Sequence, residues 1–505
     1  MKNSFFGVLG QIVLIIAGFF CQRAMNLLMG AELVGMNGVI SNIIAILSVS
    51  ELGIATAVVY NLYSAIFRQD ENEIAALMNL YRKAYCLFAL VILVLGFLAL
   101  PFVHLLIKET AFSPGYIRLV FVMWLVRTAL SYLLSYKRSM LIADQKEYVV
   151  SIVTLIVNVL NYSSTILILE LTRNYVLALG TNIAIEVVSN LWITVYVNRK
   201  YPFLIRLRKE PLNKDLVGKV LDNIKNIFVI RLFSKLLLST DNLIISRFIN
   251  TLTAGLYNNY CLVTQSLINI MVSLAGALKP TLGHLFLKED RGRDAQVLRQ
   301  ISFLFFMIVS TASVCIFCLI TPFVGDFWLN EQYLMGMGFV AASVAQFFFT
   351  AMGLPLEAVM SVTGLFEVER KVSIAVSVVN LAVSLLLVKP LGIIGVLFGT
   401  IAAYLVQIAC RMMIFFRNYV GISPLSYLFD LLQYTLLTCA EIALMYWTAM
   451  HIYQKGSFWY FLLMAAVCAL GTICLNLLLY AKTRRMKEVL ALGKELFVSN
   501  GSDEG

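Results

Sequence analysis

The sequence predicts an all-α polytopic membrane protein of about fourteen transmembrane helices, built as two six-helix repeats followed by two extra C-terminal helices. Three observations predict this fold class. Hydrophobic residues make up 60% of the 505 residues and charged residues only 13%, whereas about a quarter of a soluble domain is charged. Apolar runs of about 20 residues, enough to cross a bilayer as a helix, recur along the whole chain. Residues about 220 positions apart also match one another.

Each apolar run is expected to form one membrane-spanning helix, because about 20 helical residues cross the hydrocarbon core. The first run begins at Phe5 and is too long for the apolar core of a cleaved signal peptide, so we interpret it as the first span. The predicted spans lie near 4–30, 36–64, 84–107, 116–142, 148–171, 175–197, 222–248, 252–285, 300–322, 334–365, 372–388, 391–416, 427–449 and 458–481.

The internal repeat relates the first six spans to the next six. Gly35 recurs as Gly255 and Asn158 as Asn380, and the other matches keep an offset between 219 and 222 residues. Six spans per repeat is an even number, so the two repeats share one orientation and their axis runs along the membrane normal. In transporters built this way the substrate path lies between the halves. The alternative is chance similarity among apolar helices.

The repeat predicts the division of the chain. We expect two six-helix bundles, a basic cytoplasmic linker between them, two further transmembrane helices and a cytoplasmic tail. The corresponding ranges are 1–200, 222–420, 201–221, 421–481 and 482–505.

The basic residues indicate the orientation in the membrane. Fourteen spans place both termini on one side, and most of the 39 Lys and Arg residues fall on that side, which the positive-inside rule makes cytoplasmic. The net charge of +11 therefore reflects topology and an inner leaflet of anionic lipid, and it requires no nucleic acid partner. Five basic residues fall outside: Lys108, Arg118, Arg173, Lys389 and Lys455.

Several basic residues fall within predicted spans, where each costs roughly 2.5–3.5 kcal/mol on insertion scales unless it faces water or a partner. Arg231 and Lys235 are four residues apart and share one helix face. A cavity lined by such cations suits a phosphate; the alternative is that acidic residues pair with them to lock helices together. The predicted substrate-binding residues are Arg23, Arg127, Arg231, Lys235 and Lys279, with the amides Asn26 and Asn242.

Acidic residues at membrane depth are candidates for gating or ion coupling. Glu51 and Asp241 could each neutralise a cation in one conformation and release it in another, and Glu357 lies at a similar depth. We assign Glu441, which lies outside the repeats, to a contact between helices.

The motifs that the chain lacks narrow its chemistry. The sequence has no phosphate-binding G-x-x-x-x-G-K-[ST] loop and no G-x-G-x-x-G, and its three histidines are far apart. We therefore expect no cofactor, no metal and no catalytic residue, and we expect a monomer.

Two stretches resemble a known family. Ser50 to Ala57 is similar to the acidic-x-Gly-x-x-x-Ala stretch of the Wzx-type polysaccharide flippases, and Thr240 to Ser246 followed by Ala254 to Tyr257 is similar to their helix 7–8 signature. The resemblance covers essentially the whole chain. The superfamily also includes the lipid II flippases, which share the six-plus-six-plus-two layout, and the MATE multidrug exporters. Arg23 falls where its lipid flippases tend to carry an essential arginine.

The resemblance implies a MATE-like fold and a central cavity lined by cations. It implies a flippase that moves an undecaprenyl-(pyro)phosphate-linked oligosaccharide or a teichoic-acid-type precursor by alternating access in the bacterial cytoplasmic membrane. Its partners would be a polyprenyl-phosphate-linked saccharide and membrane lipid, with H⁺ or Na⁺ as candidate coupling ions. Two alternatives are an ion-coupled multidrug exporter and an integral-membrane saccharide polymerase, an enzyme that would want a substantial outer loop.

Overall fold

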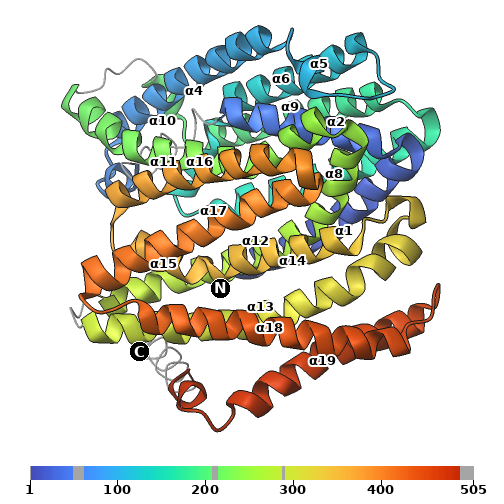
Figure 1. The fold of residues 1–505 in the computed structure, drawn as a ribbon. Helices are drawn as coiled ribbons and strands as arrows, with labels where there is room; N and C mark the ends of the chain where they lie inside the picture. The colour runs from blue at the N-terminus through green and yellow to red at the C-terminus, as the bar shows by residue number, and fades with distance from the viewer. Residues whose placement is uncertain (1, 49–61, 208–213, 287–290, 490–505) are drawn as a thin grey trace. The chain divides into compact units, whose positions relative to one another are not determined.

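A computed structural model describes residues 2–48, 62–207, 214–286 and 291–489, and every regular element in these ranges is a helix. Twelve of these helices are long and apolar enough to cross a membrane, so the chain is a multi-pass membrane protein (Figure 1). Predicted spans 2 and 7 are not among the twelve. Helix α2 (Ala31–Leu47) is shorter, and α11 (Lys214–Phe248) carries several charged residues.

The chain packs as two compact units, residues 1–259 and 260–505, and the division falls within helix α12 (Thr251–Phe286). The sequence analysis placed the boundary between the two repeats in a linker at 201–221. That division into repeats stays a prediction. The other helices of the first unit are α1 (Lys2–Met29), α4 (Glu71–Ala99), α5 (Val103–Leu106), α6 (Pro114–Ser135), α7 (Arg138–Ala143), α8 (Glu147–Thr172), α9 (Tyr175–Lys200) and α10 (Phe203–Arg206).

The second unit holds the rest of α12 and the elements that follow it. They are α13 (Arg291–Pro322), η2 (Phe323–Trp328), η3 (Glu331–Tyr333), α14 (Met337–Met352), α15 (Leu354–Val362), α16 (Phe366–Leu391), α17 (Ile393–Met413), η4 (Ile414–Val420), α18 (Leu425–Ile452) and α19 (Phe458–Tyr480).

The helix boundaries confirm the internal repeat. Helices α2 and α12 start 220 residues apart, as do α4 and α13. Helices α8 and α16 start 219 residues apart, and each is 26 residues long. Helices α18 and α19 follow the second repeat as the two extra C-terminal helices.

Local sequence signals explain where several helices begin. The Asp70 side chain accepts a hydrogen bond from the Glu73 amide at 3.0 Å and caps α4, and Asn174 caps α9 in the same way. Ser113 caps α6 directly before Pro114, whose fixed φ suits the first helical position. Between α1 and α2 the chain turns at Gly30, whose φ of 89° strongly favours glycine.

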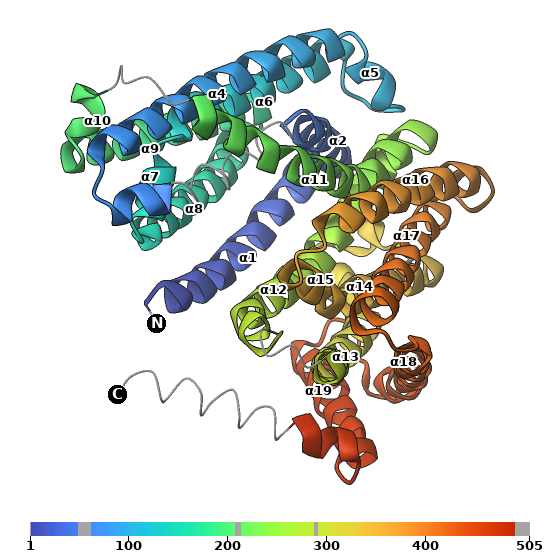
Figure 2. The same cartoon turned by 90° about the vertical axis from the view of Figure 1, so that its left-hand side faces the viewer.

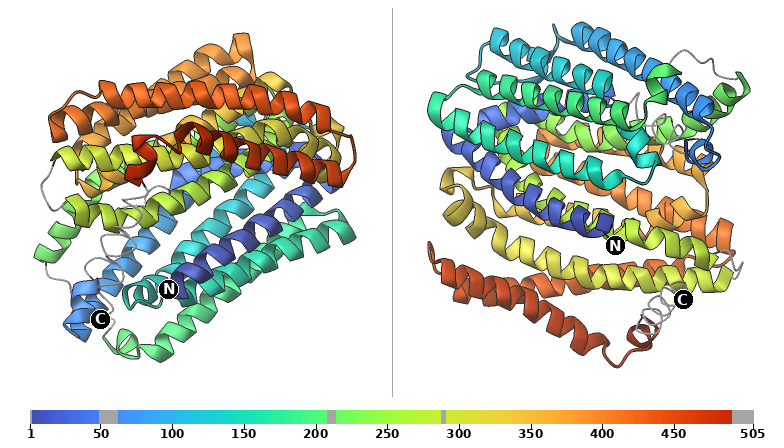
Figure 3. Two further views of the ribbon diagram at one scale, coloured as in Figure 1. Left: turned by 90° about the horizontal axis from the view of Figure 1, so that it is seen from below. Right: turned by 180° about the vertical axis from the view of Figure 1, so that it is seen from behind.

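Within the first unit, α4 lies along α6 (Figure 2), and α1 lies along α8 (Figure 3). Buried side chains of α4 and α6, such as Tyr81, Phe121 and Ile92, belong to the core of this unit. Large apolar side chains also cover the outside, for example Phe20 at 60% exposure. An apolar outer surface is what a helix bundle presents to lipid.

Within the second unit, α18 and α19 both lie along α13 (Figure 1). The outward faces of α18 and α19 are strongly apolar, and Trp459 is 78% exposed. The tightest pair in this unit is α16 and α17, which form an antiparallel hairpin turning at Gly392.

Two predicted continuous spans are broken in the structure. Predicted span 116–142 is divided into α6 and α7, and predicted span 334–365 is divided at Gly353 into α14 and α15. Pro355 follows Gly353 closely, and proline in the first turn of a helix needs no backbone donor, so a new helix starts there. Pro280, by contrast, lies inside the uninterrupted helix α12.

Candidate functional site

The start of α12, at Thr251 and Gly255, makes a close contact with α2. A Cβ atom added to Gly35 would overlap the carbonyl oxygen of Thr251 and lie 2.8 Å from the Gly255 nitrogen. One added to Gly255 would overlap the carbonyl oxygen of Ala31 and lie 3.1 Å from the Gly35 nitrogen. Residues 31 and 35 correspond to 251 and 255 in the repeat, so the contact is reciprocal, as at a twofold axis.

A buried amide network joins α1 to the same part of α12. The Asn26 and Asn259 side chains exchange two hydrogen bonds, of 2.8 and 3.0 Å, and Gln22 donates a third to Asn259 at 3.0 Å. Asn26 is 1% exposed and Asn259 is fully buried. The structure therefore places Asn26, a predicted substrate-binding residue, in a contact between helices.

Three predicted phosphate-binding cations lie on α1 and α11 of the first unit. Arg23 and Arg231 are exposed, and Lys235 is half-buried. Asp241 and Asn242 follow on α11. Asp241 is buried and accepts a hydrogen bond from the Tyr257 hydroxyl at 3.3 Å, and the buried Asn242 Oδ1 has no hydrogen-bond donor.

Arg127 has a carboxylate partner inside the first unit. Its Nε lies 2.7 Å from Glu186 Oε2, and its guanidinium lies 5.2 Å from the centre of the Trp124 ring. This half-buried ion pair links α6 to α9. Of the remaining predicted residues, Lys279 lies half-buried on α12 in the second unit, and Glu51 lies outside the described residues.

Glu357 belongs to an ion cluster around Arg411 in the second unit. Arg411 on α17 is buried; its Nε lies 3.1 Å from Glu369 on α16, and its Nη1 lies 3.4 Å from Glu357 on α15. The sequence analysis missed Arg411. A usable signal existed, because Glu369 begins one helix and Arg411 ends the next, and an antiparallel hairpin brings those ends together.

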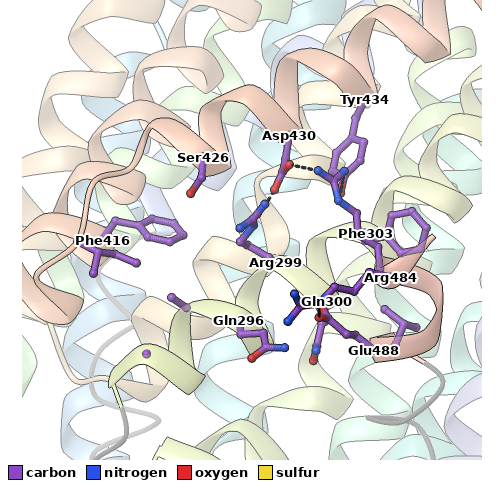
Figure 4. A pocket seen from close by; sticks show the side chains of 15 residues that line it. Gln296, Arg299, Gln300, Phe303, Phe416, Ser426, Asp430, Tyr434, Arg484 and Glu488 are labelled. Carbon is purple, nitrogen blue, oxygen red and sulfur yellow. Dashed lines mark hydrogen bonds and ion pairs between the residues drawn. The ribbon is translucent and has the colours of Figure 1, made fainter. Parts of the chain in front are cut away.

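A polar cavity of about 490 Å³ lies among α13, α18 and the segment after α19 (Figure 4). Asp430, which is 3% exposed, lines this cavity, lies 2.7 Å from Arg299 Nε and also pairs with Arg485. Arg484 pairs with Glu488 at the rim. These pairs fasten the segment after α19 to α13 and α18.

No protein-family model matches the sequence, and no curated protein matches it. Solved structures with this fold do exist. An inward closed lipid II flippase, MurJ, has a TM-score of 0.70 and 15% identity, with 94% of this chain and 99% of that chain covered.

Multidrug transporters of the MATE type share the fold as well. An inward-facing multidrug resistance MATE family transporter of the MOP superfamily has a TM-score of 0.65 and 16% identity, covering 80% of this chain and 94% of its own. The Vibrio cholerae MATE transporter VcmN has a TM-score of 0.57 and 13% identity, covering 82% of this chain and 94% of its own. At these identities the likeness shows a MATE-like fold, and the function needs a separate argument.

Proposed function

We propose that this protein is a flippase for a polyprenyl-phosphate-linked saccharide, such as an undecaprenyl-(pyro)phosphate-linked oligosaccharide or a teichoic-acid-type precursor. The observation that carries the proposal is Arg23, an exposed arginine within the apolar span Gly10–Met29. An arginine at that depth costs roughly 2.5–3.5 kcal/mol unless it faces water, a partner within the protein or a ligand. A phosphate on a carrier lipid is such a ligand, since its oxygens accept two parallel hydrogen bonds from a guanidinium.

The exposed cations on α11 support the same proposal. Arg231 is exposed and Lys235 half-buried, whereas Arg127 and Arg411 are engaged in ion pairs within the helix bundles. We propose that Arg23, Arg231 and Lys235 contact the phosphate, with Lys279, Asn242 and Asn26 as further contributors to the site. In this proposal Arg127 has a secondary part, since Glu186 already neutralises it.

The cycle we propose is alternating access between the two repeats, without a nucleotide and without a catalytic step by this protein. Asp241 and Glu51 would pair with the cations in the empty carrier, and the phosphate would take their place in the loaded carrier. Glu357 is a further candidate for coupling to H⁺ or Na⁺. We expect a monomer in the bacterial cytoplasmic membrane with both termini in the cytoplasm.

The likeness to MATE transporters favours one alternative, an ion-coupled multidrug exporter. The share of this chain that each structure aligns with favours the flippase. The lipid II flippase structure covers 94% of this chain, and the MATE structures cover 80–82%. Exposed arginines also suit an anionic substrate better than a cationic drug. We keep the saccharide polymerase, an enzyme, as a second alternative.

A variant series in liposomes tests the phosphate site. Transfer of a fluorescent polyprenyl-phosphate-linked saccharide between leaflets is followed with an impermeant quencher. Arg231→Ala and Arg23→Ala should each slow transfer about tenfold or more, since a hydrogen bond to a charged group contributes about 1.5–3 kcal/mol. Arg118→Ala, which removes another exposed arginine, is the matched control. Transfer at the wild-type rate in both variants would contradict the site.

A further inference from the structure

Glu441 is a buried acid that the proposed transport cycle does not use. It lies on α18, is 2% exposed, and neither oxygen of its carboxyl group has a hydrogen-bond partner. Burial without a partner strongly disfavours a charged carboxylate, most of all within a membrane protein. The carboxyl group must therefore be protonated, or a cation must neutralise its charge.

The polar neighbours of Glu441 are uncharged, and one of them carries a buried acceptor that lacks a donor. The carboxyl group lies beside Asn476 on α19 and Ser310 on α13. Asn476 Nδ2 donates to Ser310 Oγ at 3.1 Å, which leaves the buried Asn476 Oδ1 without a donor. An ionised carboxylate cannot fill that need because it is acceptor-only, whereas a protonated carboxyl group carries one O–H donor.

Among the described residues, the helix segments around Glu441 carry no lysine or arginine that could neutralise it. Helix α13 from residue 301 onward, α18 from 431 onward and the whole of α19 contain no Lys or Arg, and His451 lies ten residues away at the exposed end of α18. Tyr480 on α19 also lies near Glu441. Asp430 at the start of α18 and Arg485 after α19 are paired with each other.

We propose that Glu441 is a proton-binding site and that its protonated carboxyl group donates a hydrogen bond to Asn476 Oδ1. The bound proton comes from water and returns to it when the group ionises. In the neutral state the bond ties α18 to α19, while Asn476 ties α19 to α13. Loss of the proton leaves two acceptors facing each other beside an uncompensated charge, so the attachment of the extra helix pair weakens as the pH rises. This inference is independent of the molecule that the protein transports.

Infrared spectroscopy of the purified protein tests the protonation directly. The wild type should show the C=O stretch of a protonated carboxyl group, shifted in D₂O, and Glu441→Gln should lack that band. Glu367→Gln is the matched control, because Glu367 is an exposed carboxyl group in the same unit, and it should keep the band. A spectrum of Glu441→Gln that retains the whole band would overturn the proposal.

Two further measurements remain decisive if Glu441→Gln folds poorly. An apolar carbodiimide, which reacts with protonated carboxyl groups, should modify Glu441 in the wild type, and modification should decrease as the pH rises. The wild-type melting temperature should also fall with rising pH and be insensitive to Na⁺. An unmodified Glu441 would overturn the proposal. So would a wild-type melting temperature that rises with Na⁺ but not with K⁺, because a site in the protein would then hold a metal cation.

Discussion

Gly35 and Gly255 contact each other through their backbones, and they are the same position of the internal repeat. A Cβ atom on either glycine would lie within 3.1 Å of the other's nitrogen. Small residues let two membrane helices approach closely enough for such contacts. The contact between α2 and the start of α12 is therefore formed by equivalent positions of the two repeats.

Enlarging this contact should destabilise the protein. Gly255→Ala places a methyl group against the Ala31 carbonyl oxygen, which cannot move without shifting α2, so we expect a cost of about 1–3 kcal/mol in the free energy of unfolding. Gly276→Ala on the same helix is the control, since nothing lies within 4 Å of its added methyl group. Thermal unfolding in detergent measures both variants, and equal melting temperatures would contradict the close crossing.

The Arg411 cluster should respond strongly to loss of its cation. Arg411→Met leaves Glu369 without its buried partner, and breaking a buried ion pair costs about 3–5 kcal/mol. Arg417→Met, which removes a nearby exposed arginine, should change little.

The two acids of this cluster should differ from each other. Glu369→Gln should destabilise more than Glu357→Gln, because the Glu369 side chain is 12% exposed and that of Glu357 is 51% exposed. The free energy of unfolding of all four variants checks this order. The reverse order would show that Glu357 is the main partner.

Asp430 should hold the segment after α19 in place. Asp430→Asn removes the charge that Arg299 and Arg485 share, so hydrogen–deuterium exchange in residues 481–489 should become faster. Glu488→Gln removes only the pair with Arg484, which is 87% exposed, and should leave exchange unchanged. Identical exchange in Asp430→Asn and the wild type would show that Asp430 does not fasten this segment.

The predicted orientation can be checked with single cysteines in a variant that lacks the nine native ones. A cysteine at Ser457, in the loop between α18 and α19, should react with an impermeant maleimide added to intact cells. A cysteine at Ser502 should react only after the cells are opened. Labelling of position 502 from outside would reverse the topology.

Hydropathy and spacing predicted the repeat and twelve of the fourteen expected spans, because burial in lipid requires long apolar helices whatever their partners. They did not predict the interruptions at Gly353 and before α7. They did not predict that the Asn26 amide pairs with that of Asn259, and the part of Asn26 in substrate binding stays a prediction. These helices are apolar on every side, so their periodicity does not determine which face meets which neighbour.

Charged pairs were predicted only in part for the same reason. Arg127 stood out by its depth, but its partner Glu186 lies 59 residues away on another helix. Arg411 was missed, because its burial depends on how α16 and α17 pack. Glu51 lies outside the described residues, so its predicted exchange with the cations stays a prediction.

Substrate choice in liposomes tests the central claim most directly. Purified protein is reconstituted, and two assays run side by side: transfer of a labelled polyprenyl-phosphate-linked saccharide between leaflets, and uptake of an ethidium-like cation under an H⁺ or Na⁺ gradient. We predict lipid transfer that depends on the protein and slows in Arg231→Ala, with no cation uptake. Cation uptake driven by the gradient without any lipid transfer would contradict the flippase and establish the multidrug exporter in its place.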